Sequence, residues 1–118
     1  MLFRSLLRTL APGAVVCLHT TVSIDAVRAL AAIAEPHGVH VLDAGISGGE
    51  SGAQAGTLLS MVGGPTEAVT RAASVIAAFS KDVLHAGPIG TGMALKLARN
   101  ATSFAMMGAV YEIGRAHV

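Results

Sequence analysis

Two polar side chains late in the sequence have the types and the spacing that acid–base chemistry requires. Lys96 and Asn100 stand four residues apart in a segment with helical periodicity, so they project from one face, one turn apart. The residues around them are almost all uncharged apart from Arg99. Partial burial would lower the pKa of the lysine toward the range useful for proton transfer. The alternative is a lysine whose stem lies on an apolar surface while its amine reaches solvent.

A second candidate is the glycine-rich segment 42–64, with the sequence LDAGISGGESGAQAGTLLSMVGG. It predicts a strand, a turn at Ser47-Gly48-Gly49, a connection of small residues and a second strand that ends at two glycines. Glycine permits positive φ and lets a ligand approach the backbone closely. The segment therefore indicates a binding loop, but by itself it does not identify the ligand.

Thr20 and Thr21 form a third candidate because they lie between an apolar strand at 14–18 and a helix at 24–35. Ligands of open α/β sheets bind at the carboxyl ends of the strands, where these hydroxyl groups are expected. Threonines at such a position also commonly cap a helix or stabilise a turn. Both interpretations stay open.

The elements that would position these candidates alternate between strand and helix. We expect strands at 14–18, 39–46, 58–62 and 83–86, helices at 2–10, 24–35 and 65–79, a turn at Lys81-Asp82, and a long helix from Gly92 past Tyr111. The alternation predicts the α/β class, with a parallel sheet and crossover helices. The unbroken helix that follows indicates the start of a second, helical domain.

Composition excludes several functional classes. A chain of 118 residues with a net charge of +1 and only 13% charged residues is long enough for one core and lacks the basic patch that nucleic acid requires. No apolar run reaches the roughly 18 residues of a membrane span. The cysteine and the five histidines have no metal-ligand spacing, so we expect no metal site.

The first ten residues carry arginine and no acid, as a mitochondrial presequence does. The Leu-Ala-Pro-Gly that follows instead favours a helix-to-strand turn, and hence a cytoplasmic protein whose first helix belongs to the fold.

The segment 42–64, followed by HAGPIGTGMALKLARN at 85–100, resembles the β-hydroxyacid dehydrogenases. These include 3-hydroxyisobutyrate dehydrogenase and tartronate semialdehyde reductase, and they are related to 6-phosphogluconate dehydrogenase. The resemblance extends from about Leu10 to Tyr111 and joins three motifs in the right order. It implies that residues 1–90 are the C-terminal part of a Rossmann-like NAD(P)-binding domain and that residues 91–112 begin an all-α domain.

The resemblance also implies a role for each candidate. Lys96 would be the catalytic acid/base, while Ser47, Gly48, Gly49 and Asn100 would bind the substrate, with its carboxylate at the Ser-Gly-Gly turn. Thr20 and Thr21 fall on the family's Asp-x-Ser-Thr segment, without its acidic residue, and would face the cofactor, NAD or NADP. The implied reaction is hydride transfer between a nicotinamide and a small hydroxyacid, in a protein that is a homo-oligomer at full length.

The sequence departs from the family's pattern at several positions. Gly45-Ile46 replaces Pro-Val before the Ser-Gly-Gly turn, and Arg99 replaces an asparagine, which bears on the choice of substrate. The G-x-G-x-x-G fingerprint of dinucleotide binding is missing, since the segment 87–92 does not match it. We therefore expect that an N-terminal part is missing and that the chain alone is marginally stable, prone to association and inactive.

The last residues carry a separate hypothesis. Residues 113–118, Ile-Gly-Arg-Ala-His-Val, can be encoded by the nucleotides that begin a common short-read sequencing adapter. We expect them to be adapter read-through, with Glu112 a candidate as well.

Two other functions compete with the dehydrogenase. A non-enzymatic binding or scaffold module could use the same α/β segment, since a fold does not dictate its function. An imine reductase of the same superfamily is disfavoured by Lys96, because those enzymes generally lack the catalytic lysine.

Overall fold

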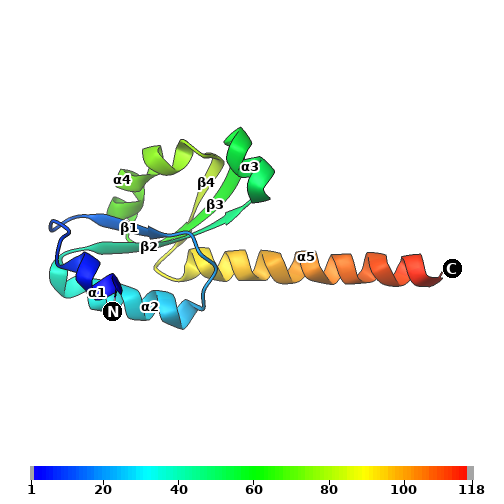
Figure 1. The fold of residues 1–118 in the computed structure, drawn as a ribbon, viewed down its shortest axis with the longest axis horizontal. Coiled ribbons are helices and arrows are strands. Elements are labelled where there is room, and N and C mark those ends of the chain that lie inside the picture. The colour runs from blue at the N-terminus through cyan, green and yellow to red at the C-terminus, as the bar shows by residue number, and fades with distance from the viewer. Residues whose placement is uncertain (1, 117–118) are drawn as a thin grey trace.

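The computed structural model describes residues 2–116, which form a four-stranded sheet flanked by helices (Figure 1). The strands, in their spatial order, are β1 (Val15–Leu18), β2 (His40–Ser47), β3 (Leu58–Gly63) and β4 (Ser80–Gly87). The helices are α1 (Leu2–Leu7), α2 (Ile24–Ala34), α3 (Gly49–Ala55), α4 (Thr66–Ala77) and α5 (Thr91–Ala116), with a 3-10 turn, η1 (Glu35–His37), after α2. Beyond the sheet, α5 projects as a single rod.

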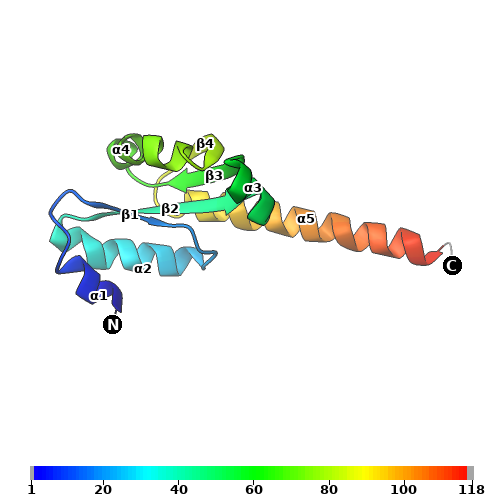
Figure 2. The same ribbon diagram turned by 45° about the horizontal axis from the view of Figure 1, so that its top comes forward.

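The sheet separates two layers of helices (Figure 2). Helix α4 covers one face, where it packs on Leu42 and Ala44 of β2. On the other face Val39 and Val41 pack against α1 and α2, and the first turns of α5 lie on β2 and β3. Successive strand residues point to opposite faces, so β2 contributes to both cores. Leu7 of α1 is only 1% exposed, which supports the interpretation of α1 as part of the fold.

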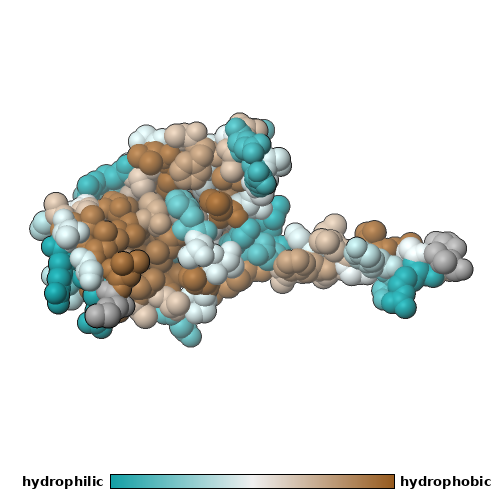
Figure 3. All heavy atoms as spheres, in the orientation of Figure 1, coloured by the Kyte–Doolittle hydropathy of each residue, from teal (hydrophilic) through white to brown (hydrophobic). Residues whose placement is uncertain are grey.

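Apolar side chains remain exposed on the distal half of α5. Phe104, Met106, Val110 and Tyr111 are each more than 60% exposed, at 68%, 64%, 69% and 71%. Figure 3 shows tan and brown surface along parts of the projecting helix and a broader apolar area over β1 and α1. These side chains form an uncovered apolar surface on α5. Within residues 2–116, none of the helices has the length and apolar character that crossing a membrane would require.

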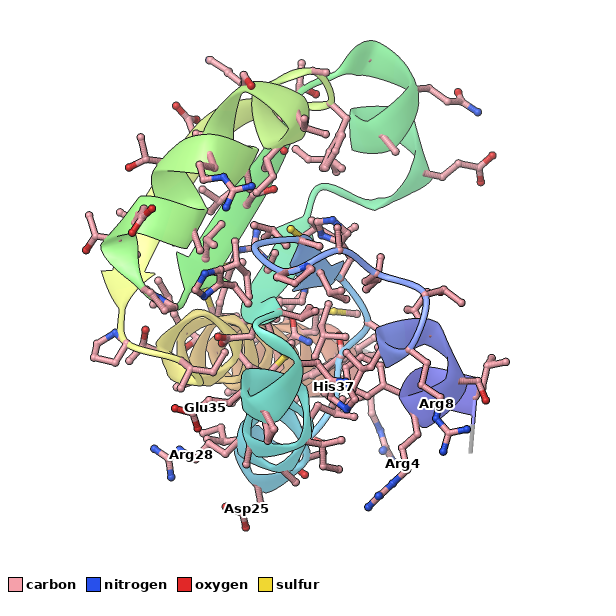
Figure 4. All side chains as sticks on the ribbon, turned by 90° about the vertical axis from the view of Figure 1, so that its left-hand side faces the viewer. Arg4, Arg8, Asp25, Arg28, Glu35 and His37 are labelled. Carbon is pink, nitrogen blue, oxygen red and sulfur yellow. The ribbon has the colours of Figure 1, made fainter. Side chains whose placement is uncertain are left out.

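Local sequence signals set the bounds of α2. The Ser23 hydroxyl accepts a hydrogen bond from the Ala26 amide at 3.2 Å, so Ser23 is the N-cap. Gly38, with φ of 66°, closes the 3-10 turn that follows the helix. The charged side chains of Asp25, Arg28 and Glu35 point away from the sheet (Figure 4). The expected helix at 24–35 is confirmed, with its last residue in the 3-10 turn.

The Rossmann-like α/β fold is confirmed, but the expectation of parallel strands throughout is wrong for the central pair. β1 with β2 and β3 with β4 are parallel, whereas β2 and β3 are antiparallel, with Gly45 opposite Met61. A parallel crossover needs about a dozen residues or more, and the connection 48–57 is shorter and returns the chain directly. That connection also contains a helix, α3, where we expected only small residues in a loop.

The expected turn at Lys81-Asp82 is likewise wrong, because both residues lie in β4. Leu58 is opposite Ser80 and Leu59 is opposite Asp82, so Lys81 is the extra residue of a β-bulge. β4 is an edge strand, where charged side chains reach solvent, and this is why the pair resembles a turn in the sequence. The segment expected to be adapter read-through continues α5 to Ala116, and residues 117–118 lie outside the described part of the chain.

Candidate functional site

Three glycines let the first turns of α5 rest directly on the backbone of the sheet. A β-carbon at Gly45 would lie only 2.7 Å from Cβ of Lys96. A β-carbon at Gly63 would lie 2.8 Å from the Gly92 amide nitrogen, and one at Gly92 would lie 2.6 Å from both the Asp43 carbonyl oxygen and the Gly63 nitrogen. These separations are shorter than side chains tolerate. The glycines therefore fix how closely Lys96 approaches β2.

A buried carboxylate fastens the start of α5. Asp43 of β2 is 0% exposed; its Oδ1 accepts a hydrogen bond from the Gly90 amide at 2.8 Å, and its Oδ2 accepts one from the Met93 amide at 2.6 Å. Ala94 is the first residue whose amide bonds back to the Gly90 carbonyl. The two amides held by Asp43 are thus among those a helix leaves unpaired in its first turn. The positive end of the helix dipole also stabilises the carboxylate.

This contact decides how the glycine-rich turn 87–92 is used. A turn of that kind at a helix N-terminus can cradle a phosphate through its amides. Here the Gly90 amide is held by Asp43 and the Thr91 amide donates to the Pro88 carbonyl, so these two amides of the turn are already paired within the chain.

Lys96 lies on the half-buried side of α5. The pKa of its amine is lowered, first because burial disfavours the charged form and second because the positive charge of Arg99 repels a proton. Both causes act in the direction that the sequence predicts. A larger fraction of the Lys96 amine is therefore neutral near physiological pH, and able to accept a proton, than in an exposed lysine.

Ser47 and Asn100 lie further along the same two elements. Asp43, Gly45 and Ser47 occupy every second position of β2, so they share the face of the strand on which α5 lies. Asp43 contacts Met93, and Gly45, two residues later on β2, contacts Lys96, three residues later on α5. The strand and the helix therefore run in the same direction. Two strand residues advance about 6.6 Å and four helical residues about 6 Å. The step from Gly45 to Ser47 along β2 is thus similar in length to the step from Lys96 to Asn100 along α5.

The Ser47-Gly48-Gly49 turn closes this end of the site. Ser47 is 9% exposed, whereas Gly48 and Gly49 are exposed at the start of α3. The φ values of Gly48 and Gly49 are 134° and 63°, which a residue with a side chain rarely adopts. A β-carbon at Gly48 would also lie 2.9 Å from Cδ2 of Leu58. The turn therefore presents bare backbone to solvent beside the end of β2.

Thr20 and Thr21 follow the end of β1, beside Asp43 and Ala44 of β2. β1 ends with Leu18 opposite Asp43, and His19 continues past it, donating from Nδ1 to the Ala44 carbonyl at 2.9 Å. The two exposed threonines follow this contact at the carboxyl end of β1. These two threonines are the residues that the sequence suggests for cofactor contact. Within residues 2–116, no group of three or more His, Cys, Asp or Glu could hold a metal ion.

Sequence reasoning did not identify Asp43 as a residue of this region. Its signal was available, because an acid between Leu42 and Ala44 in an apolar strand must find a buried partner. The identity of that partner was not available, because the Gly90 and Met93 amides are 47 and 50 residues away.

Comparisons with known proteins identify the family to which this fold belongs. Residues 1–87 match the family described as the NAD binding domain of 6-phosphogluconate dehydrogenase. The NAD-dependent L-serine dehydrogenase of Pseudomonas aeruginosa is 41% identical over 95 residues, which are 80% of this chain and 32% of that protein. The 3-hydroxyisobutyrate dehydrogenase of the same organism is 37% identical over 93 residues, 79% of this chain and 31% of that protein.

A solved structure, the 3-hydroxyisobutyrate dehydrogenase of Mycobacterium tuberculosis with L-serine, superposes with a TM-score of 0.87 at 34% identity and covers 91% of this chain and 37% of that one. The chain belongs to the family of the NAD-binding domain of 6-phosphogluconate dehydrogenase, whose cofactor class is NAD. A solved structure of 29% identity, with a TM-score of 0.83, contains NADP+. The chain spans about a third of the length of the relatives it matches.

Proposed function

We propose that these residues belong to an NAD(P)-dependent dehydrogenase that interconverts a small β-hydroxyacid and its semialdehyde. The observation that carries the proposal is the close approach of α5 to β2, which brings Lys96 beside Gly45. The family membership and the names of the relatives support the same chemistry. Because the chain spans only about a third of those relatives, the activity is proposed for a longer protein.

Each side chain would have a distinct task. The Ser47 hydroxyl and the Gly48 and Gly49 amides would bind the substrate carboxylate, and Asn100 would hold the hydroxyl-bearing end by a hydrogen bond. The lowered pKa of Lys96 suits an amine that takes the hydroxyl proton as the alcohol is oxidised and returns it to the carbonyl oxygen on reduction. The bound nicotinamide would accept or supply the hydride at the same carbon.

Thr20 and Thr21 would face the nicotinamide from the carboxyl end of β1, where ligands of such sheets bind. The proposal also includes a homo-oligomeric, cytoplasmic protein, and the exposed apolar residues of α5 support association. The 118-residue chain alone is expected to be inactive, since its sequence contains no G-x-G-x-x-G fingerprint for the dinucleotide.

The test is Lys96→Ala in the longest open reading frame that contains these residues, assayed with L-serine and 3-hydroxyisobutyrate. Loss of a positioned acid/base should lower kcat by about a hundredfold or more, because general acid–base catalysis contributes that much. Lys81→Ala, an exposed lysine on the edge strand β4, is the matched control and should leave kcat unchanged. Turnover that survives in Lys96→Ala with the same pH profile would refute the assignment. Nicotinamide binding without turnover in the unaltered protein would favour the scaffold alternative.

A further inference from the structure

One buried polar group plays no part in the proposed chemistry. The Asp43 carboxylate is 0% exposed and lies between strand β2 and the first turn of α5. Its two oxygens accept hydrogen bonds from two different backbone amides, those of Gly90 and Met93, on the two sides of the helix start. A carboxylate that accepts hydrogen bonds at both oxygens fixes the orientation of the donating helix as well as its distance.

A stability role alone explains this group poorly. Burying a carboxylate removes its hydration, and replacing a buried charge with an apolar side chain of similar volume is often neutral or even stabilising. An apolar residue at this position could fill the space between strand and helix. What it could not do is fix the rotation and the axial position of α5, because apolar contacts have no direction.

Asp43 lies on β2 and binds the start of α5, so the placement of α5 that it fixes bears on the candidate site. Met93, which it binds, lies three residues before Lys96, and Asp43 itself lies four residues before Ser47 on the same strand. Three helical residues span about 4.5 Å, so an error in the placement of Met93 is transmitted to Lys96 within one rigid turn. A β-carbon at Gly63 would lie 2.5 Å from Oδ1 of Asp43, which shows how little space the carboxylate has to move.

We propose that Asp43 is the positioning residue that sets the register of α5 against β2, and thereby the placement of the Lys96 amine relative to the carboxylate-binding turn at Ser47. The inference rests on the proposed function for its catalytic consequence, but the placement itself can be measured without turnover. Asp43 touches neither the substrate nor the reacting atoms.

The central variant is Asp43→Asn, which keeps the volume and one acceptor oxygen but turns an amide donor toward a backbone donor. We expect kcat to fall by about a hundredfold, as a displacement of about 1 Å costs when a reacting group is misplaced. The KM for the hydroxyacid should change much less than kcat, because Ser47, Gly48 and Gly49 lie outside α5 and only Asn100 moves with the helix. The unaltered reading frame that contains the chain is the reference.

Placement is read separately by a nuclear Overhauser effect between the Gly45 α-protons and the Lys96 β-protons, in protein labelled at glycine and lysine. A β-carbon at Gly45 would lie 2.7 Å from Cβ of Lys96, so these protons are close in the native arrangement. The effect should be lost or clearly weakened in Asp43→Asn. If that variant does not fold, Asp43→Ser takes its place with the same expected results, because its single hydroxyl oxygen cannot hold both the Gly90 and the Met93 amide.

The matched control is Ser80→Ala. It also removes a buried polar group, the Ser80 hydroxyl of β4, which is hydrogen-bonded to the Ser60 hydroxyl of β3 at 2.7 Å. It should lower stability while preserving the Gly45–Lys96 effect and kcat. An Asp43 variant that retains both the effect and full kcat overturns the inference, and so does an equal loss of kcat in Ser80→Ala. Failure of the proposed function is recognised independently: Lys96→Ala would then leave turnover unchanged, and the placement measurement would still decide the role of Asp43.

Discussion

Gly92→Ala tests whether α5 rests on the sheet backbone as closely as the structure indicates. A β-carbon at this buried position would lie 2.6 Å from the Asp43 carbonyl oxygen and from the Gly63 nitrogen, and closer still to the Met61 carbonyl oxygen. Carbon–oxygen contacts in proteins are about 3.3 Å or longer, so the helix start would have to retreat by at least about 0.7 Å. All three obstacles are backbone atoms that cannot rotate away.

The cost follows from this displacement. Overpacking of a closely packed contact costs about 1–3 kcal/mol, and the retreat also lengthens two charge-assisted hydrogen bonds of about 1.5–3 kcal/mol each. Replacing glycine in a helix returns at most about 1 kcal/mol of propensity. We therefore expect Gly92→Ala to lower the free energy of unfolding by roughly 2–4 kcal/mol.

The assay is urea unfolding followed by far-ultraviolet circular dichroism, with Gly108→Ala as the control on the same helix. A β-carbon at Gly108 would have no atom within 4 Å, so this substitution should raise stability by up to about 1 kcal/mol. The same chemical change on the same helix is thus expected to have opposite signs at the two positions. The reasoning is refuted if Gly92→Ala is as stable as the unaltered chain.

The remaining predictions concern the charge beside Lys96 and the buried hydroxyl pair. Arg99→Gln should raise the pKa of Lys96, because a neighbouring positive charge that lowers it is removed. The rate of alcohol oxidation, which needs the neutral amine, should then rise at higher pH than in the unaltered enzyme, and an unchanged pH–rate profile would contradict this. Ser80→Ala should cost about 1–3 kcal/mol of unfolding free energy, because it leaves the Ser60 hydroxyl buried without its partner. The double change of Ser60 and Ser80 to alanine should be less costly than the single one, and a larger cost in the double variant would exclude this explanation.

The sequence by itself determined the elements and most of their bounds. Periodicity predicted the helices and most of the strands, since such signals are local and act within a few residues. Motif order predicted the family, which the match over residues 1–87 confirms. The spacing of Lys96 and Asn100 predicted that both share one helix face, and the roles assigned to them stay predictions.

Only the tertiary structure decided how these elements meet. Whether β3 runs parallel or antiparallel to β2 depends on the path of the chain through 48–57, which local propensity does not specify. The partners of Asp43 are 47 and 50 residues distant, so no local pattern could reveal them. The close contact of Gly45 with Lys96 likewise depends on two elements packing together. A short-range signal can specify an element, but the distance between two functional groups on different elements is set by the packing that joins them.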